Sequence, residues 1–121
     1  MPRVLIVDDS PTETYKISSV LSKHGFEVLT ASSGEDGVSV ARAELPDVVL
    51  MDIVMPGLNG FQATRQLSRD AATKDIPVII VTTKDQETDR VWGERQGARG
   101  YLTKPVDDKV LIQAIRDVIS A

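Results

Sequence analysis

Three aspartates, a threonine and a lysine are the residues of this sequence best able to form a chemically active site, although they lie far apart in it. Asp8 and Asp9 are adjacent, and Asp52, Thr82 and Lys104 follow at wide intervals. Each comes at or directly after the end of a short apolar run, the pattern of a buried strand. If these strands form one parallel sheet, the side chains meet at its carboxyl edge. Carboxylates gathered there can bind a divalent cation, and one of them can take a phosphoryl group.

Segments of helical period separate the apolar runs. The runs span residues 4–7, 48–51, 78–81 and 100–103. The first helix is predicted over 11–23, because Gly25 follows it as a typical stop. The apolar residues that give this helix its spacing are Tyr15, Ile17, Val20 and Leu21. Ser33 is the expected N-cap of the second helix, with Asp36 three residues further on.

The later helices differ in how clearly the sequence marks them. The third is predicted to start near Leu58, and one of its faces is formed by Phe61, Thr64, Leu67 and Ser68. The fourth, 86–96, is the weakest pattern: a thin buried stripe of Val91 and Trp92, ending at Gly97. Asp107 is expected to cap the last helix. Its predicted inward residues are Val110, Leu111, Ala114, Ile115 and Val118.

The order of these elements predicts an α/β fold. Strand and helix alternate five times across the 121 residues. Such alternation specifies a doubly wound parallel sheet, covered on both faces by right-handed crossovers. A chain of this length is expected to form one domain, residues 1–121, with no output domain after it.

The composition excludes several classes of protein. The chain is 41% hydrophobic and 26% charged, with a net charge of -4 and no cysteine. The negative charge argues against a nucleic-acid surface. The lack of cysteine excludes disulfides and thiolate metal sites, and agrees with a cytoplasmic location. The N-terminus has too few consecutive apolar residues for a signal peptide or a membrane span.

Each polar residue at the predicted sheet edge can be given a role. The Asp52 carboxylate can attack phosphorus and form an acyl phosphate, with a metal ion neutralising the developing charge. The backbone carbonyl of Val54 could coordinate that metal. The Thr82 hydroxyl can donate to a phosphoryl oxygen. Lys104 precedes Pro105, where a cis peptide would turn the ammonium towards the phosphate or towards Asp52.

Three other residues have simpler interpretations. Tyr101 is expected near the surface, able to swing inward when Thr82 moves. His24 is expected at the C-terminal end of the first predicted helix, where its ring interacts favourably with the negative end of the helix dipole. Trp92 is expected to pack in the core or on a partner.

With these residues in place, the chain resembles the receiver domain of two-component response regulators, the CheY-like fold. The motifs that carry the resemblance are VLIVDDS, DVVLMDIVMPGLNG, PVIIVTTKD and GARGYLTKPV. The resemblance implies a flavodoxin-like sheet of order 2-1-3-4-5 with five helices. It further implies a phosphoacceptor with at most autophosphatase activity, not an enzyme, whose phosphodonor is a histidine kinase.

The resemblance also assigns the site residues. Asp52 would accept the phosphate, and Mg²⁺ would be held by Asp8, Asp9, Asp52 and the carbonyl of Val54, with Asp9 a stronger ligand than Asp8. Thr82 and Tyr101 would form the switch pair, and Lys104 would sense the phosphate.

Two longer segments narrow the resemblance. DIVMPGLNGFQATRQL and VTTKDQETDRVWGERQGARGYLTKPV look like the PilH-type regulators of type IV pilus twitching motility. In the receiver family, the positions of Val54 and Lys84 influence how long the phosphate lasts. Output is expected by docking of an effector or motor protein on a face made of 86–96, 99–103 and 107–120, with the chain a monomer or weak dimer.

Three alternatives remain open at this stage. The first is a phosphate-sink receiver in another chemosensory pathway. The second is an aspartyl-phosphate phosphohydrolase, although those enzymes have a second aspartate where this chain has Val54. The third is a flavodoxin-like FMN carrier, which Asp8 and Asp9 disfavour because their charges repel a phosphate.

Overall fold

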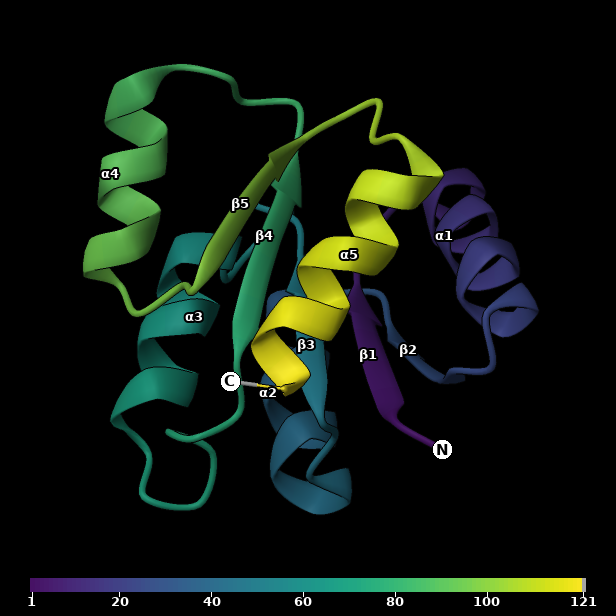
Figure 1. Ribbon diagram of the computed structural model, residues 1–121. Coiled ribbons are helices and arrows are strands. Elements are labelled where there is room, and N and C mark those ends of the chain that lie inside the picture. Colours follow the sequence, from purple (N-terminus) through teal and green to yellow (C-terminus); the bar gives the residue numbers. More distant parts are fainter. Residues whose placement is uncertain (121) are drawn as a thin grey trace.

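Strand and helix alternate along the chain and build one parallel sheet (Figure 1). The computed structural model describes residues 1–120. The strands are β1 (Arg3–Val7), β2 (Glu27–Ala31), β3 (Val48–Met51), β4 (Val78–Thr82) and β5 (Gly100–Thr103). The helices are α1 (Pro11–Lys23), α2 (Gly34–Glu44), α3 (Gly60–Arg69), α4 (Glu87–Arg95) and α5 (Asp108–Ile119). The strand order is β2-β1-β3-β4-β5, so the predicted fold class and sheet order are confirmed.

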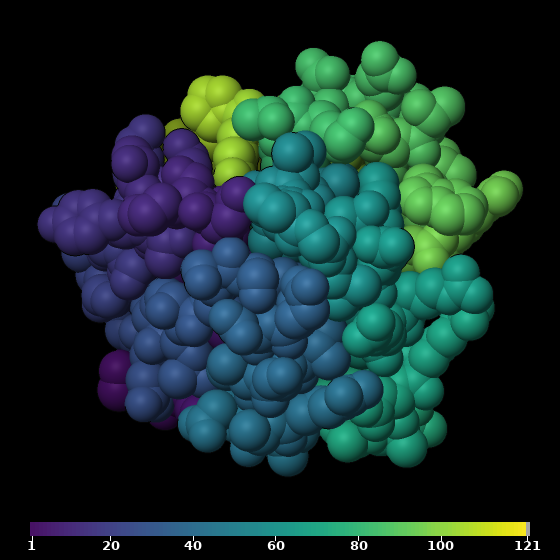
Figure 2. All heavy atoms as spheres, turned by 180° about the vertical axis from the view of Figure 1, so that it is seen from behind, coloured from purple at the N-terminus to yellow at the C-terminus, as the bar shows by residue number. Residues whose placement is uncertain are grey.

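Apolar side chains of the central strands alternate between the two faces of the sheet. Val4 and Ile6 of β1 pack with α1 and α5, which lie on one face. Leu5 and Val7 pack with α2 and α3 on the other face. This face is turned towards the viewer in Figure 2. Because both faces are covered, the central strands are apolar except at Arg3, which begins β1, and Thr82, which ends β4.

The register of the strands aligns the ends that carry the polar residues. Val7 of β1 pairs with Met51 of β3, and Thr82 of β4 pairs with Thr103 of β5. Asp8 and Asp52 are the next residues after the first pair, so they leave adjacent strands at the same level. Lys104 follows Thr103 in the same way.

The helix caps explain where most helices begin. The Ser33 hydroxyl accepts from the Asp36 backbone N–H, as predicted, and Asp107 caps α5 as predicted. Helix α3 begins at Gly60, two residues later than expected, because Asn59 and Gln62 form a capping box. In α1, Ile17 and Leu21 are buried as expected, but Tyr15 is 75% exposed and does not pack in the core.

The predicted burial of the last two helices needs correction. Val91 and Trp92 of α4 are 39% and 47% exposed, so the expected buried stripe is absent from this described helix and Trp92 is not a core residue. The buried residue of α4 is Gly93, where an added Cβ would lie 2.7 Å from Ile80 Cδ1 of β4. In α5, Val110 is 51% exposed, whereas Ile112 is buried beside Leu111. None of the helices within residues 1–120 has both the length and the apolarity that crossing a bilayer requires.

Candidate functional site

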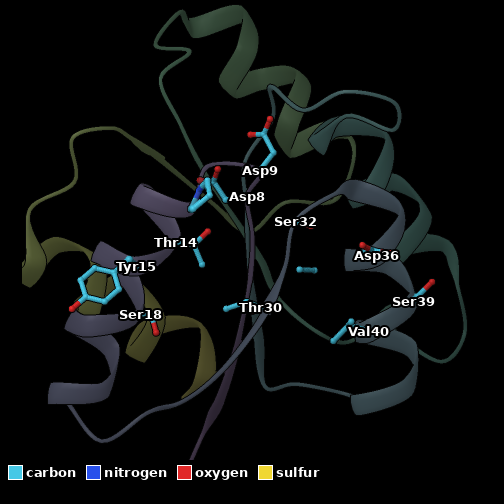
Figure 3. Close-up of a pocket in the computed structure, with 12 residues that line it drawn as sticks. Asp8, Asp9, Thr14, Tyr15, Ser18, Thr30, Ser32, Asp36, Ser39 and Val40 are labelled. Carbon is cyan, nitrogen blue, oxygen red and sulfur yellow. The ribbon is translucent and has the colours of Figure 1, made fainter.

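Three carboxylates gather at the carboxyl edge of the sheet. Asp8, Asp9 and Asp52 each offer one oxygen, and these oxygens all lie within 4.8 Å of one another. Asp8 is 4% and Asp52 8% exposed, while Asp9 faces solvent; Figure 3 shows Asp8 and Asp9 together at the end of their strand. The structure therefore brings together the acids that the sequence singled out, and their predicted roles remain to be tested.

Backbone hydrogen bonds fix the two buried acids. The Asp8 N–H donates to the carbonyl of Ala31 over 3.1 Å, and the Asp52 N–H donates to the carbonyl of Val7 over 2.9 Å. Their carboxylates accept local N–H groups as well: Asp8 Oδ1 from Ser10 over 2.9 Å, and Asp52 Oδ1 from Ile53 over 2.8 Å. Both side chains are thus oriented before any ligand arrives.

The ammonium of Lys104 lies between the two buried acids. Its Nζ is 2.8 Å from Asp8 Oδ2 and 3.6 Å from Asp52 Oδ2. The Lys104–Pro105 peptide is cis, as the sequence suggested. Lys104 was expected to pair with Asp52 in the absence of phosphate, but its shorter contact is with Asp8. One oxygen of Asp52 is therefore less tightly engaged than its neighbours.

The charges of these groups act on one another. Burial raises the pKa of Asp52 above its ordinary value, and the charge of Asp8 adds to the rise. Lys104, the Ile53 N–H and the Thr82 hydroxyl oppose it without cancelling it. Burial alone would lower the pKa of Lys104, but its hydrogen bond with Asp8 and the charges of Asp52 and Asp8 raise it overall. The site is short of positive charge, and added cationic charge would stabilise it.

Thr82 and Tyr101 are connected through the backbone of Lys84. Thr82 is fully buried, and its Oγ1 accepts from the Lys84 N–H over 3.4 Å. The Tyr101 hydroxyl donates to the Lys84 carbonyl over 2.7 Å. Burial, followed by the charges of Asp89, Asp85 and Asp52, raises the pKa of Tyr101 to about 12. Tyr101 therefore stays a neutral hydrogen-bond donor, and a single residue, Lys84, links its hydroxyl to that of Thr82.

Gly60 is a site residue that the sequence reasoning missed. It is the first residue of α3, and its N–H donates to the carbonyl of Ile53 over 3.0 Å. A Cβ at this position would lie 2.0 Å from the backbone oxygen of Asp52. Only glycine lets α3 approach the backbone at the end of β3 so closely. The Asn59-Gly60 pair indicates a turn before the helix, but the sequence gives no sign of the close approach to Asp52.

The other residues named from the sequence lie around the site or away from it. Val54 is 57% exposed in the loop that follows Asp52. His24 is the C-cap of α1, and its Nδ1 lies 2.8 Å from the carbonyl of Val20, in keeping with the expected role at the helix end. Lys84 contributes its backbone to the Thr82–Tyr101 connection.

The donor set at the acidic cluster fits Mg²⁺. Magnesium prefers hard oxygen ligands and keeps several waters, and opposite ligands on one ion are about 4.2 Å apart. The oxygens of Asp8, Asp9 and Asp52 all lie within 4.8 Å of one another, which is close enough for them to approach a single ion. Three carboxylates facing one ammonium also leave an excess of negative charge that a divalent cation offsets.

Comparisons with known proteins converge on one family. The family model described as "Response regulator receiver domain" matches residues 4–116, a range that contains every predicted site residue. Protein PilH of Pseudomonas aeruginosa is 70% identical over 120 residues, which are 99% of each chain. Response regulator PleD of Caulobacter vibrioides is 38% identical over 116 residues, which are 96% of this chain and 26% of PleD.

Solved structures give the same result. The chemotaxis protein CheY4 of Vibrio cholerae superposes with a TM-score of 0.92 at 30% identity, covering 98% of both chains. A putative response regulator from Chloroflexus aurantiacus superposes with a TM-score of 0.95 at 29% identity, covering 100% of both chains.

Proposed function

The chain belongs to the response regulator receiver domain family, and from this premise we propose that Asp52 accepts a phosphoryl group from a histidine kinase. The observation that carries the proposal is the meeting of Asp8, Asp9 and Asp52 beside the Lys104 ammonium. Phosphorylation by a histidine kinase is general in this family. The attacking oxygen would be Asp52 Oδ2, whose contact with Lys104 is 3.6 Å long, because Oδ1 already accepts from the Ile53 N–H.

The proposed transfer makes one bond and breaks one. An oxygen of the Asp52 carboxylate attacks the phosphorus of a phosphohistidine, so that a new O–P bond forms. The P–N bond breaks, and the imidazole nitrogen leaves with the electron pair and takes up a proton from water. Lys104 then exchanges part of its contact with Asp8 for a phosphoryl oxygen, and the Thr82 hydroxyl turns to donate to another.

Receiver domains bind Mg²⁺ in general, and we assign the ligands here to Asp8, Asp9, Asp52 and the backbone carbonyl of Val54. Asp9 is exposed, whereas Lys104 already neutralises part of the charge on Asp8. We therefore expect Asp9 to contribute more to the affinity than Asp8. When bound, the ion offsets negative charge on the transferring phosphoryl group.

The phosphorylated state is read, in this proposal, on the face formed by α4, β5 and α5. Movement of Thr82 towards a phosphoryl oxygen would shift the Lys84 backbone and release or redirect the Tyr101 hydroxyl. That face carries Val91, Trp92 and Val110, which are 39%, 47% and 51% exposed. Exposed apolar side chains of this size are typical of a surface that a partner covers. Phosphorylation thus biases a two-state equilibrium of the docking face.

The identity to PilH suggests the pathway. At 70% identity over nearly the whole of both chains, we propose that residues 1–121 act as a single receiver domain, a monomer or weak dimer, in type IV pilus twitching motility. An effector or motor protein would bind the α4–β5–α5 face. The family match favours a receiver over a phosphohydrolase or an FMN carrier. A phosphate-sink role in another chemosensory pathway uses the same chemistry and differs only in the partner.

Acetyl phosphate, a small phosphodonor, tests the acceptor directly. We expect the intact mass to rise by one phosphoryl group when acetyl phosphate and Mg²⁺ are added, and Asp52→Ala to abolish the gain. Asp75→Ala, which removes an exposed carboxylate far from the site in sequence, should label like the wild type. A phosphoryl group that persists in Asp52→Ala would place the acceptor elsewhere.

Magnesium binding is tested separately by calorimetric titration. Asp9→Asn should weaken Mg²⁺ binding at least tenfold, and Asp75→Asn should leave it unchanged. Equal affinities in Asp9→Asn and the wild type would remove Asp9 from the ligand set.

A further inference from the structure

We propose that the groove between α1 and α2, above the open edge of β2, docks a basic, extended segment of a partner protein. The groove lies at the opposite edge of the sheet from β5, so it is distinct from the α4–β5–α5 face. The proposal rests on the shape and charge of the groove and holds whether or not Asp52 is the phosphoacceptor. We call this surface the β2 groove; its main residues are Thr14, Tyr15, Ser18, Thr30, Asp36 and Ser39.

The β2 groove is large enough for a segment of chain. Its volume is about 610 Å³, within the range of sites that bind small-molecule ligands. Figure 3 shows its walls: Tyr15 and Ser18 come from α1, Asp36 and Ser39 from α2, and Thr30 lies on the strand between them. Its hydroxyl groups suit a ligand with backbone polar groups to satisfy.

The strand at the floor of the groove has a free edge. β2 is the outermost strand and pairs with β1 alone among the described strands. The Glu27 N–H donates to Pro2, and the Ala31 carbonyl accepts from Asp8, so these alternate residues turn their backbone groups towards β1. Val28 and Thr30 therefore turn their N–H and C=O groups outward. An extended peptide can add a strand there and satisfy those groups.

The charge of the groove selects a basic occupant. Asp8, Asp9 and Asp36 line it, and its lining residues, all within the described part of the chain, include no lysine or arginine. Lys104 engages Asp8, and Asp9 is the acid assigned to Mg²⁺ above, so Asp36 is the exposed carboxylate of the groove that an occupant can pair with. Tyr15 adds a 75% exposed ring at the rim, and a guanidinium or ammonium group is attracted to an aromatic face.

The same charges disfavour a second copy of this chain as the occupant. A second copy would present the same acidic lining from a chain of net charge -4, and its β2 strand, Glu27–Ala31, offers no lysine or arginine. Like charges brought together in a partly buried contact are costly. A partner that presents lysine or arginine side chains from an extended segment is the complement.

The experiment uses a short peptide of alternating arginine and valine as the probe, and one of alternating glutamate and valine as its control. Binding to the full chain is followed by NMR chemical shifts and amide hydrogen exchange. We expect the basic peptide to bind, to perturb α1, β2 and α2, and to protect the amides of Val28 and Thr30. The acidic peptide should not bind.

Three variants distinguish the contribution of the free β2 edge to peptide binding from the contribution of the acidic charge. Thr30→Pro removes an outward N–H without removing a β1–β2 hydrogen bond, and it should abolish binding. Asp36→Asn should weaken it about two- to fivefold, the size of one exposed ion pair. Asp75→Asn should bind like the wild type. Asp36→Asn is on a helix surface and keeps the test valid if Thr30→Pro does not fold.

Several results would overturn the proposal. Binding of both peptides alike, absence of binding, or shifts centred on β5 would each remove the β2 groove as a basic-peptide site. Unchanged affinity in Asp36→Asn and in folded Thr30→Pro would do the same. Concentration-dependent dimerisation of the chain alone, lost in Thr30→Pro, would make a second copy the occupant instead.

Discussion

Helices α4 and α5 pack against the same strand, β4, yet they are anchored to it very differently. From one face, α5 buries Leu111, Ile112 and Ile115 in the cluster that contains Ile79 and Val81. From the other face, α4 buries Gly93 alone among its nine residues. A helix that buries little apolar area costs little to displace. The comparison indicates that the acidic site is held by a rigid core, while the helix next to the Thr82–Tyr101 connection is free to respond.

The largest expected effect compares one residue from each helix. Ile115 is fully buried, so Ile115→Ala should lower the free energy of unfolding by about 2–5 kcal/mol. Trp92 is 47% exposed, so Trp92→Ala should change it by about 0.5 kcal/mol or less. Urea unfolding measures both. Losses of similar size would mean that α4 is anchored as firmly as α5.

A substitution of Gly60 tests whether the close approach of α3 to the backbone of Asp52 holds this carboxylate in position. A Cβ there would lie 2.0 Å from the Asp52 carbonyl oxygen, so Gly60→Ala should cost about 1–3 kcal/mol of stability and slow labelling by acetyl phosphate. Gly100→Ala is the matched control, because its Cβ would meet Ile79 Cγ2 at 3.3 Å, a much milder contact. If both variants fold and label like the wild type, the close approach of α3 does not position Asp52.

The Asp52 carboxylate itself should destabilise the metal-free protein at neutral pH. Its pKa is raised in the folded state, mainly by burial, so its favourable contribution to stability is present at low pH and is lost as the pH rises through the folded-state pKa. In the presence of a chelator, Asp52→Asn should therefore be more stable at pH 7 by about 1 kcal/mol. Thermal unfolding should show this gain in stability shrinking towards acid pH. A gain that grew on acidification would contradict a raised pKa of Asp52 in the folded state.

The smallest effect concerns the hydrogen bond that holds the Tyr101 hydroxyl to the Lys84 carbonyl. Tyr101→Phe should cost about 0.5–1 kcal/mol. Amide hydrogen exchange should accelerate in the loop between β4 and α4 and remain unchanged in α5. Faster exchange in that loop and in α5 alike would show a general loss of stability and no selective loosening.

The sequence predicted the parts of the molecule that depend on periodicity and caps. Strands buried on both faces read as apolar runs, and Ser33 and Asp107 cap the helices they were expected to cap. The three acids were found because strand ends of a parallel sheet share an edge, whatever their separation in the chain.

The errors occur where tertiary packing overrides a local pattern. Trp92 and Tyr15 are large and apolar enough to suggest a core position, but both are exposed. The burial of Gly60 against Asp52 and the backbone connection through Lys84 depend on how loops pack against each other. Side-chain type alone carries no signal for contacts that are made by the backbone.

The most direct test of the account uses Trp92, the one tryptophan of the chain, as a reporter on α4. Its fluorescence should change when acetyl phosphate and Mg²⁺ are added to the wild type, because phosphorylation of Asp52 should reach α4 through Thr82, Lys84 and Tyr101. Asp52→Asn should show no change under the same conditions. If the mass of the wild type rises by one phosphoryl group while the emission of Trp92 stays constant, the proposed coupling between the acidic site and α4 is contradicted.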